Sequence, residues 1–259
     1  MSLVSVEYGG KTARITLTRA ERSNALSPGL IYGLLQAVEA AAARRVSTLV
    51  LAAEGRNFST GGDVGLFAEA VTDGRGRAYA RELVGGLHRL IMALLRLPAV
   101  VVTAAQGAIT GGSAGLILAS DYVLLGEDAF LQPWYSRVGF SPDGGWTALL
   151  PDRIGAHRAL AMQIDNRRLG AAQAVELGLA ERLVPVAELP AAVETVLTDL
   201  AASRIDSILA AKRLIWDQAR LARVGARLDA EAAAFEGLIE QPGTAAGMAD
   251  FLAGARADA

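Results

Sequence analysis

Two glycine-rich segments of this sequence have the composition of loops that stabilise negative charge. Residues 57–63 read Asn-Phe-Ser-Thr-Gly-Gly-Asp, and residues 107–115 read Gly-Ala-Ile-Thr-Gly-Gly-Ser-Ala-Gly. Glycine lets a backbone N–H approach a ligand closely, and the first amides of a helix are free to donate. Two such loops side by side could direct two donors at one oxygen, which is the arrangement of an oxyanion hole. Either loop alone could equally be a tight connection between a strand and a helix.

Asp143 is the candidate acid/base group. It lies in the segment Ser141-Pro142-Asp143-Gly144-Gly145, where a turn should fix its position shortly before a helix. A carboxylate there could take a proton from a carbon whose enolate oxygen the two loops hold. The alternative is an N-cap, in which Asp143 only accepts hydrogen bonds from the first amides of the helix.

Alternating strands and helices must hold these loops in place. Apolar alternation within residues 4–18 predicts a half-exposed strand, and Ser27-Pro28 predicts the start of a helix that runs to about residue 44. Continuous aliphatic runs predict three buried strands, and a long helical stretch predicts a second helix. The strands are 46–52, 99–103 and 121–125, and the helix is 75–96. The pattern predicts an α/β core with too few strands for an α/β barrel.

The carboxyl-terminal part has a different pattern. From about residue 171 the sequence is almost wholly helical in character, rich in alanine and leucine. We expect a core at residues 1–199 and a helical region at residues 200–259. The apolar faces of those helices could serve an oligomer interface or pack on the core of the same chain.

Composition excludes several classes of function. The net charge of −2 argues against a nucleic-acid-binding surface. The chain has no cysteine and only two histidines, His88 and His157, which we expect on helices, so we expect no metal site. No run of about 18 apolar residues and no signal-like segment is present, and we expect a soluble, cytoplasmic protein that binds no membrane.

Five motifs in order resemble the crotonase superfamily. Residues 58–63 are similar to its F-(C/S)-x-G-x-D pattern, and residues 106–121 to its glycine-rich segment that ends in L-x-L-x-x-D. The others are Arg22-Ser-Asn-Ala-Leu26, similar to R-x-N-A-L; residues 139–145, similar to G-(x)2-P-x-x-G-G; and residues 174–184, similar to A-x-x-x-G-L-V. The resemblance covers about residues 10–185.

The resemblance implies a fold and a substrate class. The fold is a ββα spiral core with a carboxyl-terminal helical trimerisation region, and a homotrimer or hexamer is expected. The substrate is an acyl-CoA thioester, so coenzyme A arrives as part of the substrate and no separate cofactor is expected. The oxyanion donors are the amides of Gly62 and Gly112. The residues expected along the coenzyme A path are Arg22, Ala25, Thr60 and Asp63.

The hydratases of that superfamily use two glutamates, and both are replaced here. The first position falls on Gly115, and the second falls on Trp134 or, by the spacing to Gly139, on Tyr135. Neither glycine nor an indole transfers a proton near neutral pH. We therefore expect Trp134 and Tyr135 to lie near the substrate in an apolar pocket, with Phe140 and Trp146 as further candidates for its lining.

Several superfamily members that shift double bonds carry an aspartate at the position of Asp143, as do some ring-forming naphthoate synthases. The preferred hypothesis is therefore a Δ3–Δ2 enoyl-CoA isomerase with Asp143 as its base. Other enolate chemistry, such as C–C bond formation or cleavage, and a non-catalytic acyl-CoA-binding protein are the alternatives. Residues 111–115 also match the nucleophile elbow of serine hydrolases at Ser113, but His157 follows that serine too soon for such a fold.

Overall fold

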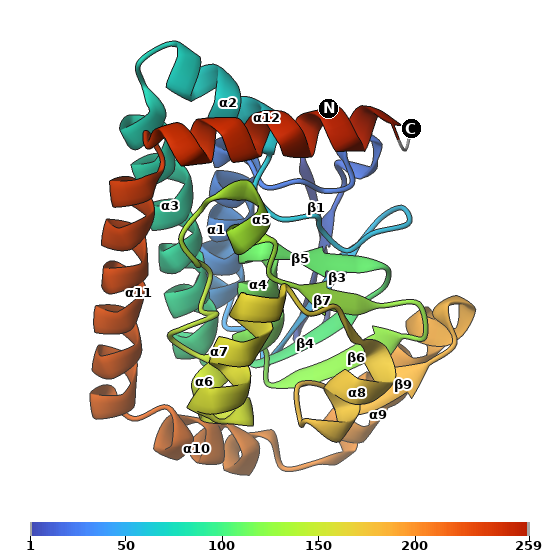
Figure 1. Ribbon diagram of the computed structural model, residues 1–259. Coiled ribbons are helices and arrows are strands. Elements are labelled where there is room, and N and C mark those ends of the chain that lie inside the picture. The colour runs from blue at the N-terminus through green and yellow to red at the C-terminus, as the bar shows by residue number, and fades with distance from the viewer. Residues whose placement is uncertain (1, 258–259) are drawn as a thin grey trace.

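A six-stranded sheet crosses the centre of the computed structural model, which describes residues 2–257 (Figure 1). Its strand order is β1-β2-β3-β4-β6-β9; β1 and β2 pair antiparallel, and the other neighbours pair parallel. The strands are β1 (Val4–Gly9), β2 (Thr12–Leu17), β3 (Thr48–Ala53), β4 (Val100–Ala105), β6 (Tyr122–Gly126) and β9 (Arg182–Val184).

A second sheet of three short strands carries one of the glycine-rich loops. It is formed by β5 (Ala108–Thr110), β7 (Phe130–Gln132) and β8 (Leu169–Gly170), in the order β5-β7-β8. The chain passes from β4 into β5 through Gly107, which has a φ of +60°. A Cβ on Gly107 would lie 2.2 Å from the carbonyl oxygen of Arg56. This sharp passage between the sheets therefore requires glycine.

Twelve α-helices among the described residues surround the sheets. Those near the glycine-rich loops are α1 (Pro28–Ala43), α2 (Val64–Thr72), α3 (Gly76–Arg96), α4 (Ala114–Leu118), α5 (Tyr135–Val138) and α6 (Leu150–Ile154). The later ones are α7 (Ala156–Asp165), α8 (Ala171–Glu176), α9 (Leu189–Ala202), α10 (Ile205–Ile215), α11 (Gln218–Leu238) and α12 (Pro242–Ala257). Helix α11 runs along α3, and α12 crosses α2 and α5 (Figure 1).

The two faces of the six-stranded sheet bury different helices. Along β3, Leu49 and Leu51 belong to the main core with α1 and α3, whereas Val50 belongs to a smaller cluster with α9. Because both faces are covered, the buried strands carry aliphatic residues on both sides. This explains why β3 and β4 stand out in the sequence as continuous aliphatic runs.

The carboxyl-terminal helices share the main core. Val224, Leu228 and Phe235 of α11 are buried in the same cluster as the apolar residues of α1 and α3. The apolar faces expected in residues 200–259 are thus used at least partly within the chain, and the expected trimer remains a prediction. Within residues 2–257, no helix combines the length and apolar character that a membrane span requires.

Most of the predicted elements are present, with two differences. Ser27 caps α1 by accepting a hydrogen bond from the amide of Leu30, and α3 begins one residue after its predicted start. The alternating segment 4–18 holds two strands, because Gly10, with a φ of +57°, turns the chain back on itself. The almost wholly helical pattern predicted after residue 171 is interrupted by the short edge strand β9, which the sequence interpretation did not identify.

Candidate active site

Backbone hydrogen bonds join the two glycine-rich loops. The amide of Ser59 donates to the carbonyl oxygen of Ala108 at 3.0 Å, and the amide of Thr110 donates to that of Ser59 at 3.1 Å. A Cβ on Gly61 would lie 2.5 Å from the carbonyl oxygen of Thr110 and 3.3 Å from the Cα of Gly111. The loops are therefore in backbone contact, which any side chain at position 61 would prevent.

Gly62 and Gly112 lie on these loops and line one cavity. Among the hydrogen bonds of residues 2–257, the amide of Gly62 has no acceptor. Gly112 lies in a short 3-10 helix, Gly111–Ser113, whose first amides have no acceptor within the helix. Gly62 and Gly112 thus border one space from adjacent loops, and the role of their amides as oxyanion donors remains a prediction.

Ser113 has a structural role in this arrangement. Its side chain is buried, and its hydroxyl donates to the carbonyl oxygens of Ser59 at 3.0 Å and Thr110 at 2.8 Å. His157 is exposed on α7. A serine nucleophile activated by His157 is therefore excluded, and Ser113 instead ties the second loop to the first.

The carboxylate of Asp143 lies against Gly112. A Cβ built on Gly112 would lie 2.9 Å and 3.2 Å from the two carboxylate oxygens, and the Tyr135 hydroxyl donates to Oδ1 at 2.5 Å. Helix α6 begins at Leu150 with Leu149 as its cap residue, so the interpretation of Asp143 as an N-cap was wrong. Asp143 is 7% exposed and lines the cavity.

Burial controls the protonation of this carboxylate. Burial raises the pKa of Asp143 to about 6. The Tyr135 hydrogen bond and the nearby His88 lower that pKa, and Glu231 raises it. Burial, together with the negative charge and hydrogen bond of Asp143, raises the pKa of Tyr135 well above 10, so Tyr135 remains a donor. Asp143 is therefore ionised at neutral pH and is a stronger base than an exposed aspartate.

The cavity is largely apolar and has a volume of about 240 Å³. Besides the two loops, Asp143 and Tyr135, its walls combine aliphatic side chains with aromatic rings. The rings belong to Phe67, Phe130, Trp134, Phe140, Phe235 and Phe251. Such a lining excludes water and strengthens electrostatic interactions within the site.

The carboxyl-terminal helices supply two of these rings. Phe235 of α11 lies with its ring centre 4.9 Å from that of Phe140, and Phe251 of α12 lies 5.5 Å from Trp134. The sequence showed apolar faces on these helices but not what they contact, so both residues were missed. Trp146 does not line the cavity; its indole nitrogen donates to the carbonyl oxygen of Gly111 at 2.7 Å.

The structure distinguishes the two candidates for the second hydratase position. Tyr135 is buried beside Asp143, whereas Trp134 is half-buried with a φ of +65°. The strained backbone of Trp134 is held by Asn166, whose side-chain oxygen accepts its amide hydrogen at 2.7 Å. Tyr135 is thus the residue in contact with Asp143.

The first hydratase position has no room for a side chain. A Cβ on Gly115 would lie 2.4 Å from the carbonyl oxygen of Gly144 and 2.6 Å from a methyl group of Ile91. A glutamate at position 115 would displace the segment that carries Asp143. A side chain at position 115 is therefore incompatible with the observed placement of Asp143.

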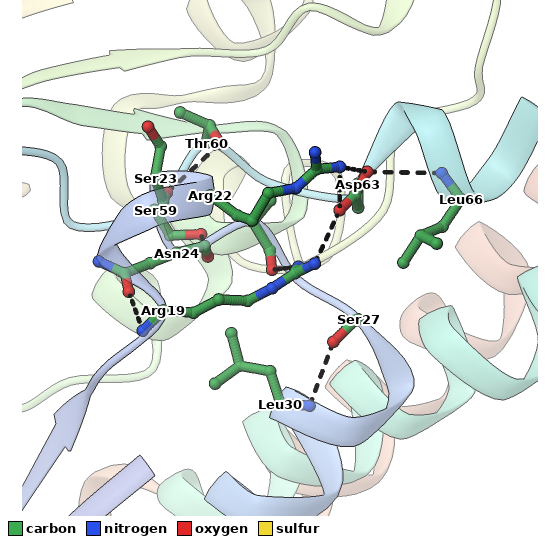
Figure 2. Close-up of polar contacts among 11 residues, drawn as sticks. Arg19, Arg22, Ser23, Asn24, Ser27, Leu30, Ser59, Thr60, Asp63 and Leu66 are labelled. Atoms are coloured by element: carbon green, nitrogen blue, oxygen red, sulfur yellow. Dashed lines mark hydrogen bonds and ion pairs between the residues drawn. The ribbon is translucent and has the colours of Figure 1, made fainter. Parts of the chain in front are cut away.

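Three of the four residues predicted on the coenzyme A path, Arg22, Thr60 and Asp63, lie in one cluster (Figure 2). Ala25 adjoins it, because its amide donates to the carbonyl oxygen of Arg22 at 3.0 Å. Asp63 is buried, caps α2 through the amide of Leu66 and pairs with Arg19 and Arg22, each at 3.1 Å. Arg19 also donates to the carbonyl oxygen of Ala25 at 2.7 Å, and the sequence interpretation did not identify this arginine.

Thr60 connects this cluster to the cavity. It is exposed at the cavity lining, and its amide donates to the carbonyl oxygen of Ser23 at 3.1 Å (Figure 2). The side chain of Arg22 is 54% exposed nearby. Thr60 is thus the one of the four predicted residues that lines the cavity, the other three lie beside it, and their contact with coenzyme A remains a prediction.

The sequence matches the model of the enoyl-CoA hydratase/isomerase family over residues 7–256. The chain belongs to this family. The resemblance to the crotonase superfamily is therefore confirmed. A solved enoyl-CoA hydratase structure from Bacillus halodurans has the same fold, with a TM-score of 0.89 and 23% identity over 96% of this chain and 100% of that one.

Two relatives within this family carry different activities in their names. The trans-2-decenoyl-[acyl-carrier-protein] isomerase of Streptococcus mutans is 30% identical over 217 residues, covering 83% of this chain and 81% of that protein. The 4-chlorobenzoyl coenzyme A dehalogenase-2 of an Arthrobacter species is 30% identical over 204 residues, covering 77% and 72%.

Asp143→Asn should stabilise this family member at high pH. The raised pKa means that ionisation of Asp143 costs stability above about pH 6, and the cost disappears as the pH falls below 3.8. The difference between the two pKa values corresponds to ~3 kcal/mol. Denaturant unfolding at pH 8 should show a gain of that order, absent at pH 3.5. Asp73→Asn, at an exposed ion pair, is the control. A less stable Asp143→Asn protein at pH 8 would contradict this assignment.

Tyr135→Phe should raise the pKa of Asp143 further. The variant removes a hydrogen bond that favours the ionised carboxylate. Carboxyl ¹³C NMR titration of the ligand-free protein measures the pKa directly. The exposed Tyr32 provides a matched control, Tyr32→Phe, which should leave the titration unchanged. An unchanged or lower pKa in Tyr135→Phe would rule out this hydrogen bond as a determinant.

Proposed function

We propose that this protein is an acyl-CoA isomerase that moves a double bond between the Δ3 and Δ2 positions, with Asp143 as the base. The observation that carries the proposal is the contact of the Asp143 carboxylate with Gly112 in an apolar cavity. A thioester oxygen bound by the amides of Gly62 and Gly112 would bring the carbons next to it close to that carboxylate. Coenzyme A is part of the substrate, and no separate cofactor is needed.

One carboxylate is sufficient for this reaction. Asp143 removes a proton from the α carbon of the Δ3-enoyl thioester, and the electrons move onto the thioester oxygen as a dienolate. The amides of Gly62 and Gly112 hold that oxygen, and each such donor commonly contributes about 3 kcal/mol to transition-state stabilisation. The protonated Asp143 then returns the proton at the γ carbon, which leaves the mass of the substrate unchanged.

The residues at the cavity and at position 115 disfavour hydration. Asp143 is the one carboxylate among the described residues that line the cavity. Addition of water needs a second acid/base group, and the packing at Gly115 leaves no room for one. The name of the Streptococcus mutans relative also gives an isomerase, which supports the proposed reaction class.

The coenzyme A moiety is proposed to pass the cluster at the cavity rim. Arg19 and Arg22 share the single negative charge of Asp63, so the cluster keeps a net positive charge. The exposed guanidinium of Arg22 is suited to a phosphate, and Thr60 borders the cavity entrance. Ala25 is proposed to border this path through its backbone. Its side chain is buried, and its carbonyl oxygen accepts a hydrogen bond from Arg19.

Asp143→Asn should abolish isomerisation while leaving thioester binding intact. We expect turnover of a 3-enoyl-CoA to fall by at least ~10³-fold, because the amide cannot act as a base. Mass spectrometry separates isomerisation, which conserves mass, from hydration, and calorimetry measures binding. Asp73→Asn should retain full turnover. Equal turnover by Asp143→Asn and the wild type would refute the role of Asp143.

Phe251→Ala should shift the preferred acyl chain to longer substrates. Phe251 lines the cavity from α12, so its removal extends the apolar space. One added methylene in a hydrophobic pocket is worth about 10-fold or more in kcat/KM. The ratio of kcat/KM for two chain lengths should move in favour of the longer by that order, and Tyr32→Ala should not change it. An unchanged ratio would place the acyl chain elsewhere.

Dehalogenation of an aromatic acyl-CoA is the second candidate. The Arthrobacter relative is named as a 4-chlorobenzoyl coenzyme A dehalogenase, and the cavity here is lined by aromatic rings that suit a flat ring. Asp143 would attack the ring carbon that bears chlorine, chloride would leave, and water would hydrolyse the resulting ester. Incubation with 4-chlorobenzoyl-CoA and measurement of chloride decides between the candidates. Tight binding without conversion of either thioester would instead favour a non-catalytic acyl-CoA-binding protein.

A further inference from the structure

The segment that follows Asp143 is held by a single side chain from α11. Glu231 is 3% exposed, and its Oε2 accepts the amide hydrogen of Gly145 at 2.9 Å. Its Oε1 accepts from the amide of Thr147 at 2.7 Å, the hydroxyl of Thr147 at 2.7 Å and the amide of Ala148 at 3.0 Å. Four donors from residues 145–148 thus converge on one buried carboxylate.

These bonds compensate for the lack of regular structure between Asp143 and α6. Burying a carboxylate is costly, and hydrogen bonds to its charged form offset that cost. The connection to Asp143 is short, because Gly144 lies between it and the first residue that Glu231 holds. A Cβ on Gly144 would lie 2.4 Å from the carbonyl oxygen of Gly112. Gly144 therefore packs directly on the second glycine-rich loop, and Glu231 holds the next residue in place.

His88 of α3 completes a buried group around Asp143. It is 6% exposed, and its Nε2 lies 3.6 Å from Oε2 of Glu231, with no hydrogen-bond partner among residues 2–257. The groups that influence the pKa of Asp143 are then Tyr135 from α5, His88 from α3 and Glu231 from α11. Neither His88 nor Glu231 lines the cavity, so neither is placed to contact a substrate bound there.

We propose that Glu231 and His88 form a buried pair that positions Asp143 for proton transfer. The pair acts through Asp143 and does not touch substrate, so both are positioning residues. The proposal rests on the proposed function for its catalytic consequence. It also gives helix α11, which packs along α3, a role in the active site beside its role in the core.

Glu231→Gln tests the positioning role. Glutamine offers one oxygen, so one side of the bonded segment loses its acceptor. We expect kcat on a 3-enoyl-CoA to fall ~10- to 100-fold while KM stays within about threefold, because small displacements of a catalytic group reduce the chemical step. Glu236→Gln is a matched control on α11, since Glu236 pairs with Arg81 at the surface. Unchanged kcat in Glu231→Gln, or a loss carried by KM, would overturn the proposal.

Thr147→Val tests the same proposal if the Glu231→Gln protein does not fold. It removes one of the four donors and leaves the carboxylate in place, and kcat should fall about threefold or more with KM unchanged. An unchanged kcat would count against the proposal.

A substrate-free measurement separates this proposal from the proposed function. In His88→Gln, carboxyl ¹³C titration should find the pKa of Asp143 above its wild-type value, because the electrostatic influence of His88 lowers that pKa. An unchanged pKa would remove His88 from the pair. Absence of turnover in the wild-type protein would refute the proposed function, whereas the titration would still report whether the pair is coupled to Asp143.

Discussion

Backbone contact between three segments is the constraint on which the site depends. The loop at Gly61 touches the loop at Gly111, and Gly144 rests on the carbonyl oxygen of Gly112. A side chain at Gly61 or Gly144 would clash with the backbone of the second glycine-rich loop and force the segments apart. The amides of two loops and the carboxylate of Asp143 can share one cavity only because these positions lack side chains.

Burial is also the main influence on the protonation of Asp143. The Asp143 carboxylate is buried at a largely apolar cavity, which favours its protonated form, while Tyr135 and His88 favour the ionised form. The balance keeps the group ionised at neutral pH but more basic than in water. The segment that follows Asp143 has no regular structure to hold it. Glu231, from a distant part of the sequence, holds it by accepting hydrogen bonds from its amides.

Local sequence signals predicted the frame of this structure well. Glycine spacing, the Ser27-Pro28 cap and the aliphatic runs identified the loops, α1, β3 and β4, and the resemblance identified the family. The contributions of Glu231, Phe235 and Phe251 to the site could not be predicted. Helical periodicity shows which face of a helix is buried, but not which residues that face contacts. Arg19 was missed for a related reason, since its ion pair joins residues far apart in sequence.

The most direct test of the one-base mechanism follows the fate of the transferred proton. A 3-enoyl-CoA deuterated at the α carbon should be converted in ordinary water to a 2-enoyl-CoA that retains part of its label at the γ carbon. Retention is expected because the apolar cavity shields the protonated Asp143 from solvent. Complete loss of label together with water addition to the product would contradict the account, because it would require a second, solvent-exposed acid/base group.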